Sequence, residues 1–375
     1  MNKAIKYRLY PTTEQAVIFS KTFGCCRKIW NLMLSDKINS YELTGTFERQ
    51  TPAMYKKEYP YLKEVDSLAL SNVQLNLESA IRNCFDRKRK IRNGFPVYKS
   101  SKHSRKSYTT NYVYNNIRLG ENYINLPKVK KVSAVIHRLP DPDWKLKSVT
   151  VSQDSDGKYY ASVLFEYEDI NSNHIPDITN AIGLDYKSDG LYMDSNGNIG
   201  SDHKYYRESH SKLSKEQRKL SRMKGSKKGE TKSNNYLKQS KKVNRIHTHT
   251  SNQRKDNLHK LSTKIANSYD VVCVESLDMK NISNKDFGNG KATMDNGYGM
   301  FINFLEYKMA DRGKYLVKVD RYYPSSQICS CCGRKHKLKL TDRIYKCECG
   351  AVMDRDYNAA INILNEGLRL LKETD

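Results

Sequence analysis

Two short cysteine-glycine segments limit the fold of this chain more than any other feature of its sequence. They are CSCCG at 329–333 and CECG at 347–350, and a short basic connector separates them. Glycine in such a tight turn lets backbone N–H groups approach sulfur, and two thiolate pairs complete a closed tetrahedral site. This arrangement predicts a zinc ribbon whose four ligands are Cys329, Cys332, Cys347 and Cys349.

The two cysteine pairs differ in spacing, because the second has one intervening residue where the first has two. Cys331 is a spare thiol that could replace a ligand. His336 could in principle be a ligand too, but we expect it to be solvated or to face phosphate. Four thiolates leave no open coordination position, so we expect a structural Zn²⁺ that stabilises the fold. The other cysteines are expected to be small buried core residues: Cys25, Cys26, Cys84 and Cys273.

The balance of charge favours a polyanionic partner. The 375 residues include 66 Lys+Arg against 41 Asp+Glu, a formal net charge of +25, and 27 tyrosines offer flat faces on which bases can stack. A basic peripheral membrane protein is the alternative, but no basic amphipathic helix with a bulky apolar face is visible. No signal-peptide core or stretch of membrane-spanning length appears either. We therefore expect a cytoplasmic protein with no membrane partner.

The first half of the chain changes from strand to helix and back to strand. Residues 3–10 alternate as a strand does, 13–92 carry helical spacing, and 107–168 alternate again around an Asp156-Gly157 turn. Since the first strand must also pair with a partner, we expect the helical block to be an insertion in a small antiparallel barrel or sheet.

A polar linker at 171–180 introduces a second domain. We expect a buried strand and a meander at 181–199, a strand in YDVVCVES, a helix around MFINFLEYKMADRG, a strand in KYLVKVD and a last helix from about 355.

Residues 212–255 contain 15 Lys/Arg and two acidic residues, in a helical context that glycine and serine interrupt. So basic a run repels itself unless phosphates neutralise it, and a solvated loop is the alternative. Tyr205, Tyr206 and Tyr236 lie nearby. The side chains that we expect to contact nucleic acid are Arg87, Lys88, Arg89, Lys90, Lys99, Arg218, Arg222, Lys241, Lys242, Arg245 and Arg254.

Carboxylates also stand at the ends of two apolar runs. Asp185 ends AIGLD and Glu275 ends VVCVE, so both side chains are expected at the edge of a sheet. On the last helix Asp354 and Asp356 lie about 200° apart at 3.6 residues per turn, so only one can face that sheet. Asp354 is better placed as a helix N-cap or as a solvated side chain. Asp356 is the candidate, because it shares a face with Ala359, Ala360 and Ile363.

This order of strand Asp, strand Glu and helix Asp predicts an RNase H-type metal site. Three clustered carboxylates raise one another's pKa values unless cations neutralise them. Two Mg²⁺ held by Asp185, Glu275 and Asp356 can activate a water and stabilise the leaving oxygen of a phosphodiester. The carboxylates would then fix the catalytic metals while the basic surface holds the nucleic acid.

Long motifs in a fixed order resemble those of the transposon-encoded TnpB proteins, which are similar to the ancestors of type V CRISPR effectors. They are KYRLYPTTEQ, FGCCRKIWN, FPVYKS, IGLDYKSDGLYM, NLHKLSTKIANSYDVVCVESLDMKNI, VDRYYPSSQICSCCG and CGAVMDRDYNAAINIL, and they cover nearly the whole chain. The resemblance implies a prokaryotic RNA-guided DNA endonuclease, associated with the nucleoid when bound to DNA. By their place in these motifs, Asp185, Glu275 and Asp356 would form the RuvC catalytic set. The tight Cys347-Glu348-Cys349 spacing departs from the family pattern.

The resemblance also implies a multidomain chain of α+β and α/β parts. A wedge β-barrel domain would span 1–11 and 107–172, around a helical recognition lobe at 12–106. A RuvC-like nuclease domain would span 179–325 and 353–375, interrupted at 326–352 by a zinc-ribbon module that binds target nucleic acid. The partners would be a guide RNA from the transposon end and double-stranded target DNA beside a short flanking motif.

Two other functions fit the same residues less completely. A DNA transposase or recombinase with an RNase H-type site would join strands and bind transposon-end DNA without RNA. A zinc-ribbon regulator would bind nucleic acid without cutting it, and the three carboxylates argue against it.

Overall fold

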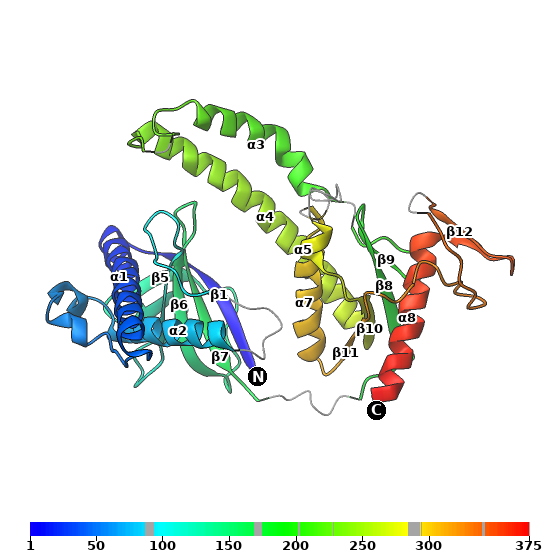
Figure 1. Ribbon diagram of the computed structural model, residues 1–375, viewed down its shortest axis with the longest axis horizontal. Coiled ribbons are helices and arrows are strands. Elements are labelled where there is room, and N and C mark those ends of the chain that lie inside the picture. Colours follow the sequence, from blue (N-terminus) through cyan, green and yellow to red (C-terminus); the bar gives the residue numbers. More distant parts are fainter. Residues whose placement is uncertain are drawn as a thin grey trace. The chain divides into compact units, whose positions relative to one another are not determined.

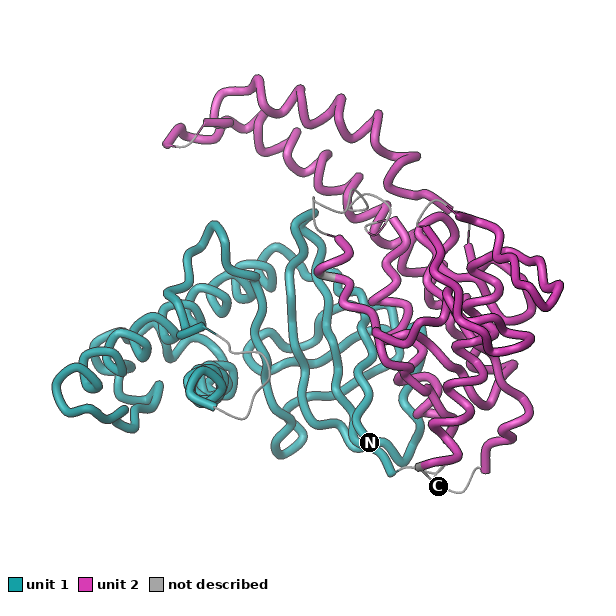
Figure 2. The backbone as a smooth tube through the Cα atoms, turned by 45° about the vertical axis from the view of Figure 1, so that its right-hand side comes forward, with its two compact units in different colours: residues 1–168 teal, residues 169–375 magenta. Residues whose placement is uncertain are grey.

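The computed structural model describes the whole chain except residues 87–93, 169–174, 202, 228, 284–292, 294, 340–341 and 375. The chain forms two compact units, Met1–Glu168 and Asp169–Asp375, which Figure 2 draws in different colours. Arg87, Lys88, Arg89 and Lys90, expected to contact nucleic acid, lie outside the described residues. In the described part of the chain, no helix is both long enough and apolar enough to cross a membrane.

The first unit contains a seven-stranded antiparallel sheet in the order β2-β6-β7-β1-β5-β4-β3. Its first strand lies in the middle, paired with β7 on one side and β5 on the other. This confirms that the helical block is inserted between the first strand and the rest of the sheet. The strands are β1 (Asn2–Tyr10), β2 (Lys106–Asn111), β3 (Arg118–Leu119), β4 (Tyr123–Leu126), β5 (Lys130–Val135), β6 (Lys145–Gln153) and β7 (Tyr159–Glu166).

The expectation of a closed barrel is wrong for the strands that the structure describes. Their pairing stops at β2 on one edge and β3 on the other, so the sheet is open. A barrel closes only when its two edge strands form a ladder with each other. The two-residue strand β3 pairs with β4, and no ladder between β3 and β2 is present among the described residues.

The helices of the first unit pack on this sheet. They are α1 (Thr13–Thr44) and α2 (Ser67–Phe85), joined through the short 3₁₀ turns η1 (Met54–Lys56) and η2 (Pro60–Lys63). A capping box begins α1, because the Thr12 hydroxyl accepts from Gln15 N–H and the Gln15 side chain accepts from Thr12 N–H. Of the four cysteines predicted to be buried, three are; Cys84 is only half-buried, at the end of α2.

The second unit is built on a four-stranded sheet in the order β11-β10-β8-β9. β8, β10 and β11 are parallel to one another, and β9 is antiparallel to β8. Its elements, seen in Figure 1, are β8 (Ala181–Lys187), β9 (Leu191–Asp194), α3 (Tyr205–Ser221), α4 (Asn234–Ser268), β10 (Val271–Glu275), α5 (Met279–Ile282), α7 (Tyr298–Ala310), β11 (Tyr315–Val319), β12 (Ile344–Lys346), β13 (Val352–Asp354) and α8 (Arg355–Thr374).

Alternate residues of β8 and β10 enter two different cores. Ile182, Leu184, Val272 and Val274 join a core with α4 and α7, whereas the opposite face of the sheet packs against α8. Figure 1 shows α7 and α8 on opposite sides of the sheet. Side chains of a strand alternate between its two faces. The odd-numbered residues of β8 and β10 therefore point toward α8.

Gly183 lets α8 lie directly on the sheet. A Cβ atom at this position would come within 2.2 Å of the Ala360 carbonyl oxygen and 2.8 Å of the Leu364 Cβ. Ala359 and Ala360, on the face of α8 that meets the sheet, are fully buried. The helix therefore approaches β8 more closely than any side chain at 183 would allow.

We predict that Gly183→Ala destabilises the second unit by about 1–3 kcal/mol, because the added methyl group must push α8 away from β8. Gly299→Ala is the matched control, since a Cβ atom there would meet only Met279 Cγ at an ordinary 3.6 Å. Urea unfolding, combined with hydrogen exchange of the α8 amides, measures the difference. Equal stability of the two variants would contradict the proposed close contact.

Candidate active site and metal centre

The structure brings Asp185, Glu275 and Asp356 to one cleft. Leu184 of β8 pairs with Val274 of the parallel strand β10, so Asp185 and Glu275 follow side by side at the same edge of the sheet. Both belong to the odd-numbered set that faces α8. Asp356 enters from the first turn of α8, and all three carboxylates line a cleft of about 690 Å³.

The start of α8 distinguishes the two aspartates that the sequence places there. Asp354 Oδ1 accepts hydrogen bonds from the backbone N–H groups of Asp356 at 2.8 Å and Tyr357 at 3.1 Å. This confirms Asp354 as the N-cap. Asp356 is therefore the acidic residue of this helix that is available to the cleft.

The electrostatics of the cleft favour a cation. Burial, followed by the charges of Glu275 and Asp356, raises the pKa of Asp185 well above its ordinary value, although Arg355 and Lys187 oppose the shift. Burial also raises the pKa of Glu275 to about 7. Carboxylate oxygens are the ligands that Mg²⁺ and other hard divalent cations prefer, so this donor set fits such an ion.

Basic side chains share the cleft with the carboxylates, and none of them is among the site residues expected from the sequence. Lys187 Nζ forms an ion pair with Asp356 Oδ2. Arg321, Arg343 and Arg355 line the same cleft. The alternation of β8 contains a signal for Lys187, because it lies two residues after Asp185 and therefore on the same face of the strand.

Asn296 fixes the end of β8. Its side-chain amide donates to the carbonyl oxygens of Lys187 at 3.1 Å and Ser188 at 2.7 Å. The preceding residue, Asp295, is buried and accepts from the Tyr206 N–H at the start of α3. Asp295 and Asn296, which precede α7, thus support both the carboxylate-bearing strand β8 and the start of α3.

The four cysteines predicted as zinc ligands also come together. Their sulfur atoms lie within 4.8 Å of one another, with 3.7 Å between Cys329 and Cys349 and 3.5 Å between Cys332 and Cys347. A tetrahedral zinc site with Zn–S bonds of about 2.3 Å requires sulfurs about 3.8 Å apart, so the arrangement fits Zn²⁺. Cys331 is exposed and outside this group, and His336 Nε2 lies 3.3 Å from Cys347 Sγ.

The cluster favours one thiolate even before a metal is considered. Burial raises the pKa of the Cys329 thiol, but hydrogen bonds outweigh this effect and lower the pKa to about 6. The donors are the backbone N–H groups of Cys332 and Cys331, followed by the thiols of Cys347 and Cys349. Such N–H groups around sulfur are typical of metal-binding knuckles.

Two buried asparagines on α8 connect the cysteine cluster to the carboxylate cleft. Asn358 accepts from Ser330 N–H at 2.9 Å and donates to the Ile328 carbonyl at 2.7 Å. Asn362 donates to the carbonyls of Ser325 and Ile328. The backbone on both sides of Cys329 is therefore bonded to the helix that carries Asp356.

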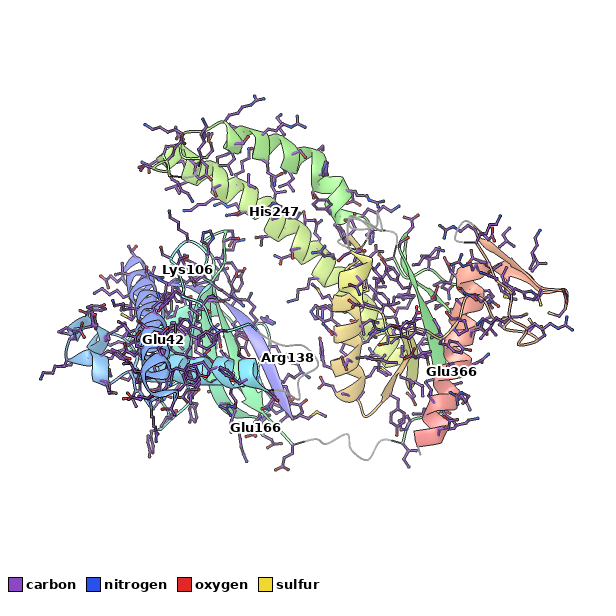
Figure 3. The ribbon with its side chains drawn as sticks, in the orientation of Figure 1. Glu42, Lys106, Arg138, Glu166, His247 and Glu366 are labelled. Carbon is purple, nitrogen blue, oxygen red and sulfur yellow. The ribbon has the colours of Figure 1, made fainter. Side chains whose placement is uncertain are left out.

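The basic run folds as a helical hairpin, so the alternative of a solvated loop is wrong for most of 212–255. α3 and α4 lie side by side in Figure 1, and Gln217 approaches His247, labelled in Figure 3, at 3.5 Å. Lys242 also pairs with Glu216 across the hairpin at 2.7 Å. The side chains that this hairpin exposes include those of Arg218, Arg222, Lys241, Lys242 and Arg245.

Two other predicted contact residues have different surroundings. Arg254 is half-buried near Gly297, at the root of the hairpin. Lys99 belongs to the first unit, where its Nζ lies 3.4 Å from the centre of the Trp30 ring. Neither residue shares the exposed surface of the hairpin.

We predict that Cys329→Ser loses the zinc ion, whereas the matched control Cys331→Ser retains it. The first change removes a sulfur of the four-membered group and the second removes an exposed thiol outside it. Elemental analysis of the purified chains should find about one zinc per wild-type chain, since the described residues contain one group of four cysteines that fits a tetrahedral zinc site. Equal zinc content in both variants would contradict the ligand assignment.

We also predict that the contribution of Glu275 to the stability of the metal-free protein decreases as the pH rises from about 4.5 to 7. The pKa of Glu275 increases from 4.5 to about 7 in the folded chain, so in this window the folded state holds a proton that the unfolded state releases. The stabilising effect of the proton that Glu275 holds in the folded state is fully present below pH 4.5 and is lost above pH 7. Glu275→Gln should remove it.

Urea midpoints of both proteins in EDTA, measured from pH 4.5 to 8, test this prediction. The wild-type midpoint should fall relative to that of Glu275→Gln across the window. A difference between the two proteins that is independent of pH would contradict the raised pKa.

Comparisons with known proteins show which family and which fold this chain resembles. Three family models match, described as "Helix-turn-helix domain" at residues 1–46, "Probable transposase" at 162–286 and "Cas12f1-like, TNB domain" at 298–363. A solved cryo-EM structure of a Cas12f1-sgRNA-target DNA complex has a TM-score of 0.60 at 13% identity and covers 97% of this chain and 99% of its own. That likeness shows a shared mixed α/β fold.

Curated relatives extend the match to sequence. A "Putative RNA-guided DNA endonuclease" of Streptomyces pristinaespiralis is 35% identical over 98% of this chain and 90% of its own length. The TnpB-like protein L79 of Acanthamoeba polyphaga mimivirus is 34% identical over 37% of this chain and 28% of its own. With an ordered set of motifs along its length and a relative this similar over nearly all of it, the chain belongs to the TnpB family.

Proposed function

We propose that this chain is a transposon-encoded, RNA-guided DNA endonuclease that hydrolyses both strands of its target at one site. The observation that carries the proposal is the convergence of Asp185, Glu275 and Asp356 on a single cleft with basic walls. The long match to a relative named as a putative RNA-guided DNA endonuclease supports the proposal that this chain uses a guide RNA.

The domain boundaries are part of this proposal, and the observed strand order supports the insertion of the helical block in the first sheet. We assign 1–11 and 107–172 to a wedge domain built on an open sheet, with a recognition lobe at 12–106. A RuvC-like nuclease domain takes 179–325 and 353–375, and a zinc ribbon takes 326–352. The connections through Asn358 and Asn362 support treating the ribbon as an insertion that is bonded to the nuclease domain.

In this site Asp185, Glu275 and Asp356 would hold two Mg²⁺. When bound, these ions supply an activated water and charge stabilisation at the leaving oxygen. Arg321, Arg343 and Arg355 present donors to phosphate on the walls of the cleft, where a charged hydrogen bond orients the strand. The four cysteines would hold Zn²⁺, which would fix the backbone that α8 contacts.

The exposed basic side chains of the α3–α4 hairpin would bind the guide RNA or its heteroduplex with target DNA. In this scheme base pairing selects the sequence, and the protein recognises backbone shape and a short flanking motif. Contacts of this kind release counterions, so the affinity should fall steeply as salt concentration increases.

A DNA transposase that works without RNA is the second candidate, because the family model described as "Probable transposase" matches residues 162–286. It would use the same carboxylates to join strands. RNA distinguishes the two functions, since a transposase should bind transposon-end DNA on its own.

We predict that Asp185→Ala protein, purified from cells that carry its native flanking DNA, retains one discrete RNA through high salt. This RNA should extend beyond the transposon boundary and so specify the target. Wild-type protein with that RNA should cut matching DNA in Mg²⁺, and Asp185→Asn should bind the DNA without cutting it. Sequencing of the bound RNA is the first measurement. Heterogeneous RNA, or none, would favour the transposase instead.

A further inference from the structure

We propose that Lys187 affects both the binding of a divalent cation and the binding of phosphate in the carboxylate cleft. Its ammonium group competes with a divalent cation for Asp356, and it faces the phosphate of the bound strand once the cation has taken that carboxylate. This inference rests on the proposed nuclease function.

The ion pair between Lys187 and Asp356 is an internal feature of the cleft. Only 20% of the Lys187 side chain and 17% of the Asp356 side chain are exposed. Exposed ion pairs on a protein surface are commonly incidental, whereas removing two charged groups from water is costly unless their geometry is specific. The ion pair between Lys187 and Asp356 is this sheltered and includes a proposed metal ligand, so we infer that it has a specific role in the site.

The backbone of Lys187 is fixed, and its side chain is long enough to move. Lys187 pairs with Leu191 of β9, and Asn296 donates to its carbonyl oxygen. Beyond this anchor, four methylene groups carry a compact charge with three donors. The same anchored lysine can therefore reach either Asp356 or another anion in the cleft.

Competition follows from where the ammonium group lies. Lys187 Nζ occupies Oδ2 of Asp356, one of the oxygens that a hard divalent cation would use as a ligand. A cation at this oxygen and an ammonium group beside it repel each other, because like charges a few ångströms apart in a sheltered site are poorly screened. The lysine must leave Asp356 when a divalent ion binds there.

The phosphate of the substrate is the anion that can receive the displaced ammonium. Phosphodiester hydrolysis adds negative charge to the phosphoryl oxygens in the transition state, and a positioned cation stabilises that charge. Arg321, Arg343 and Arg355 already make the walls of this cleft basic. Lys187 differs from these arginines because, before a metal ion binds, its ammonium group is paired with one of the three carboxylates, that of Asp356.

A purely structural role makes the opposite prediction. If Lys187 only held Asp356 in place, its removal would loosen that carboxylate and weaken the binding of divalent ions. If Lys187 competes, its removal strengthens ion binding but slows cleavage when the ion is saturating.

The test compares Lys187→Met with Lys204→Met in the full-length, zinc-containing chain. Lys204 is the matched control because it pairs with Asp189, which also lines the cleft, at 2.6 Å, so the change in charge is the same. Calorimetric titration with Mg²⁺ in the absence of nucleic acid measures ion binding. DNA cleavage at saturating Mg²⁺ measures the second role.

We expect Lys187→Met to bind Mg²⁺ about tenfold more tightly, since a neighbouring positive charge is removed. It should cleave at least about tenfold more slowly at saturating Mg²⁺, the cost of one lost donor to the transition state. Lys204→Met should stay within about twofold of wild type in both measurements, as expected for an exposed pair. Lys187→Arg, which keeps the charge, should retain wild-type Mg²⁺ affinity.

Weaker Mg²⁺ binding by Lys187→Met would overturn the competition. Tighter binding with an unchanged rate would overturn the role at the phosphate. If Lys187→Met does not fold, as judged by its zinc content, tighter Mg²⁺ binding by Lys187→Arg would overturn the competition instead. If the wild-type protein cuts no DNA, the proposed function fails, while the Mg²⁺ titration still decides whether Lys187 competes.

Discussion

The close contact between α8 and β8 is the interaction on which the candidate active site depends. Two carboxylates come from adjacent parallel strands and the third comes from the helix that crosses them, so the distance between helix and sheet sets the size of the cleft. Gly183 permits that distance because it has no side chain to meet the Ala360 carbonyl. A bulkier residue would move Asp356 together with the whole of α8.

The cysteine cluster is bonded to the same helix and so contributes to this geometry. Asn358 and Asn362 lie one helical turn apart and bond to backbone groups on both sides of Cys329. Both side chains are buried, so losing these partners would leave polar groups unsatisfied. A metal that holds the cysteines in place therefore also stabilises the first turns of the helix that carries Asp356.

Much of this site could be predicted because strands and helices have regular periods. The apolar run before Asp185 and the run before Glu275 identified two buried strands, and the helical period separated Asp356 from the cap residue Asp354. Lys187 was missed although the same alternation places it on the correct face. Asn296 had no local signal, since its partners are backbone carbonyls more than 100 residues away in sequence. Whether the first sheet closes depends on whether its edge strands β2 and β3 pair, and the alternation within single strands does not specify such a long-range pairing.

The alternation of β8 has a consequence for how this chain can change over evolution. One set of its residues, Ile182 and Leu184, builds an apolar core, and the other set, Gly183, Asp185 and Lys187, serves the helix and the cleft. Inserting or deleting one residue within the strand would exchange the two sets, placing a carboxylate among apolar side chains and leucine in the cleft. Apart from Gly183, a substitution in β8 changes the contacts of one side chain, whereas a change in the length of the strand changes all of them at once. The length of this seven-residue strand is therefore more tightly constrained by the fold than the identity of most of its residues.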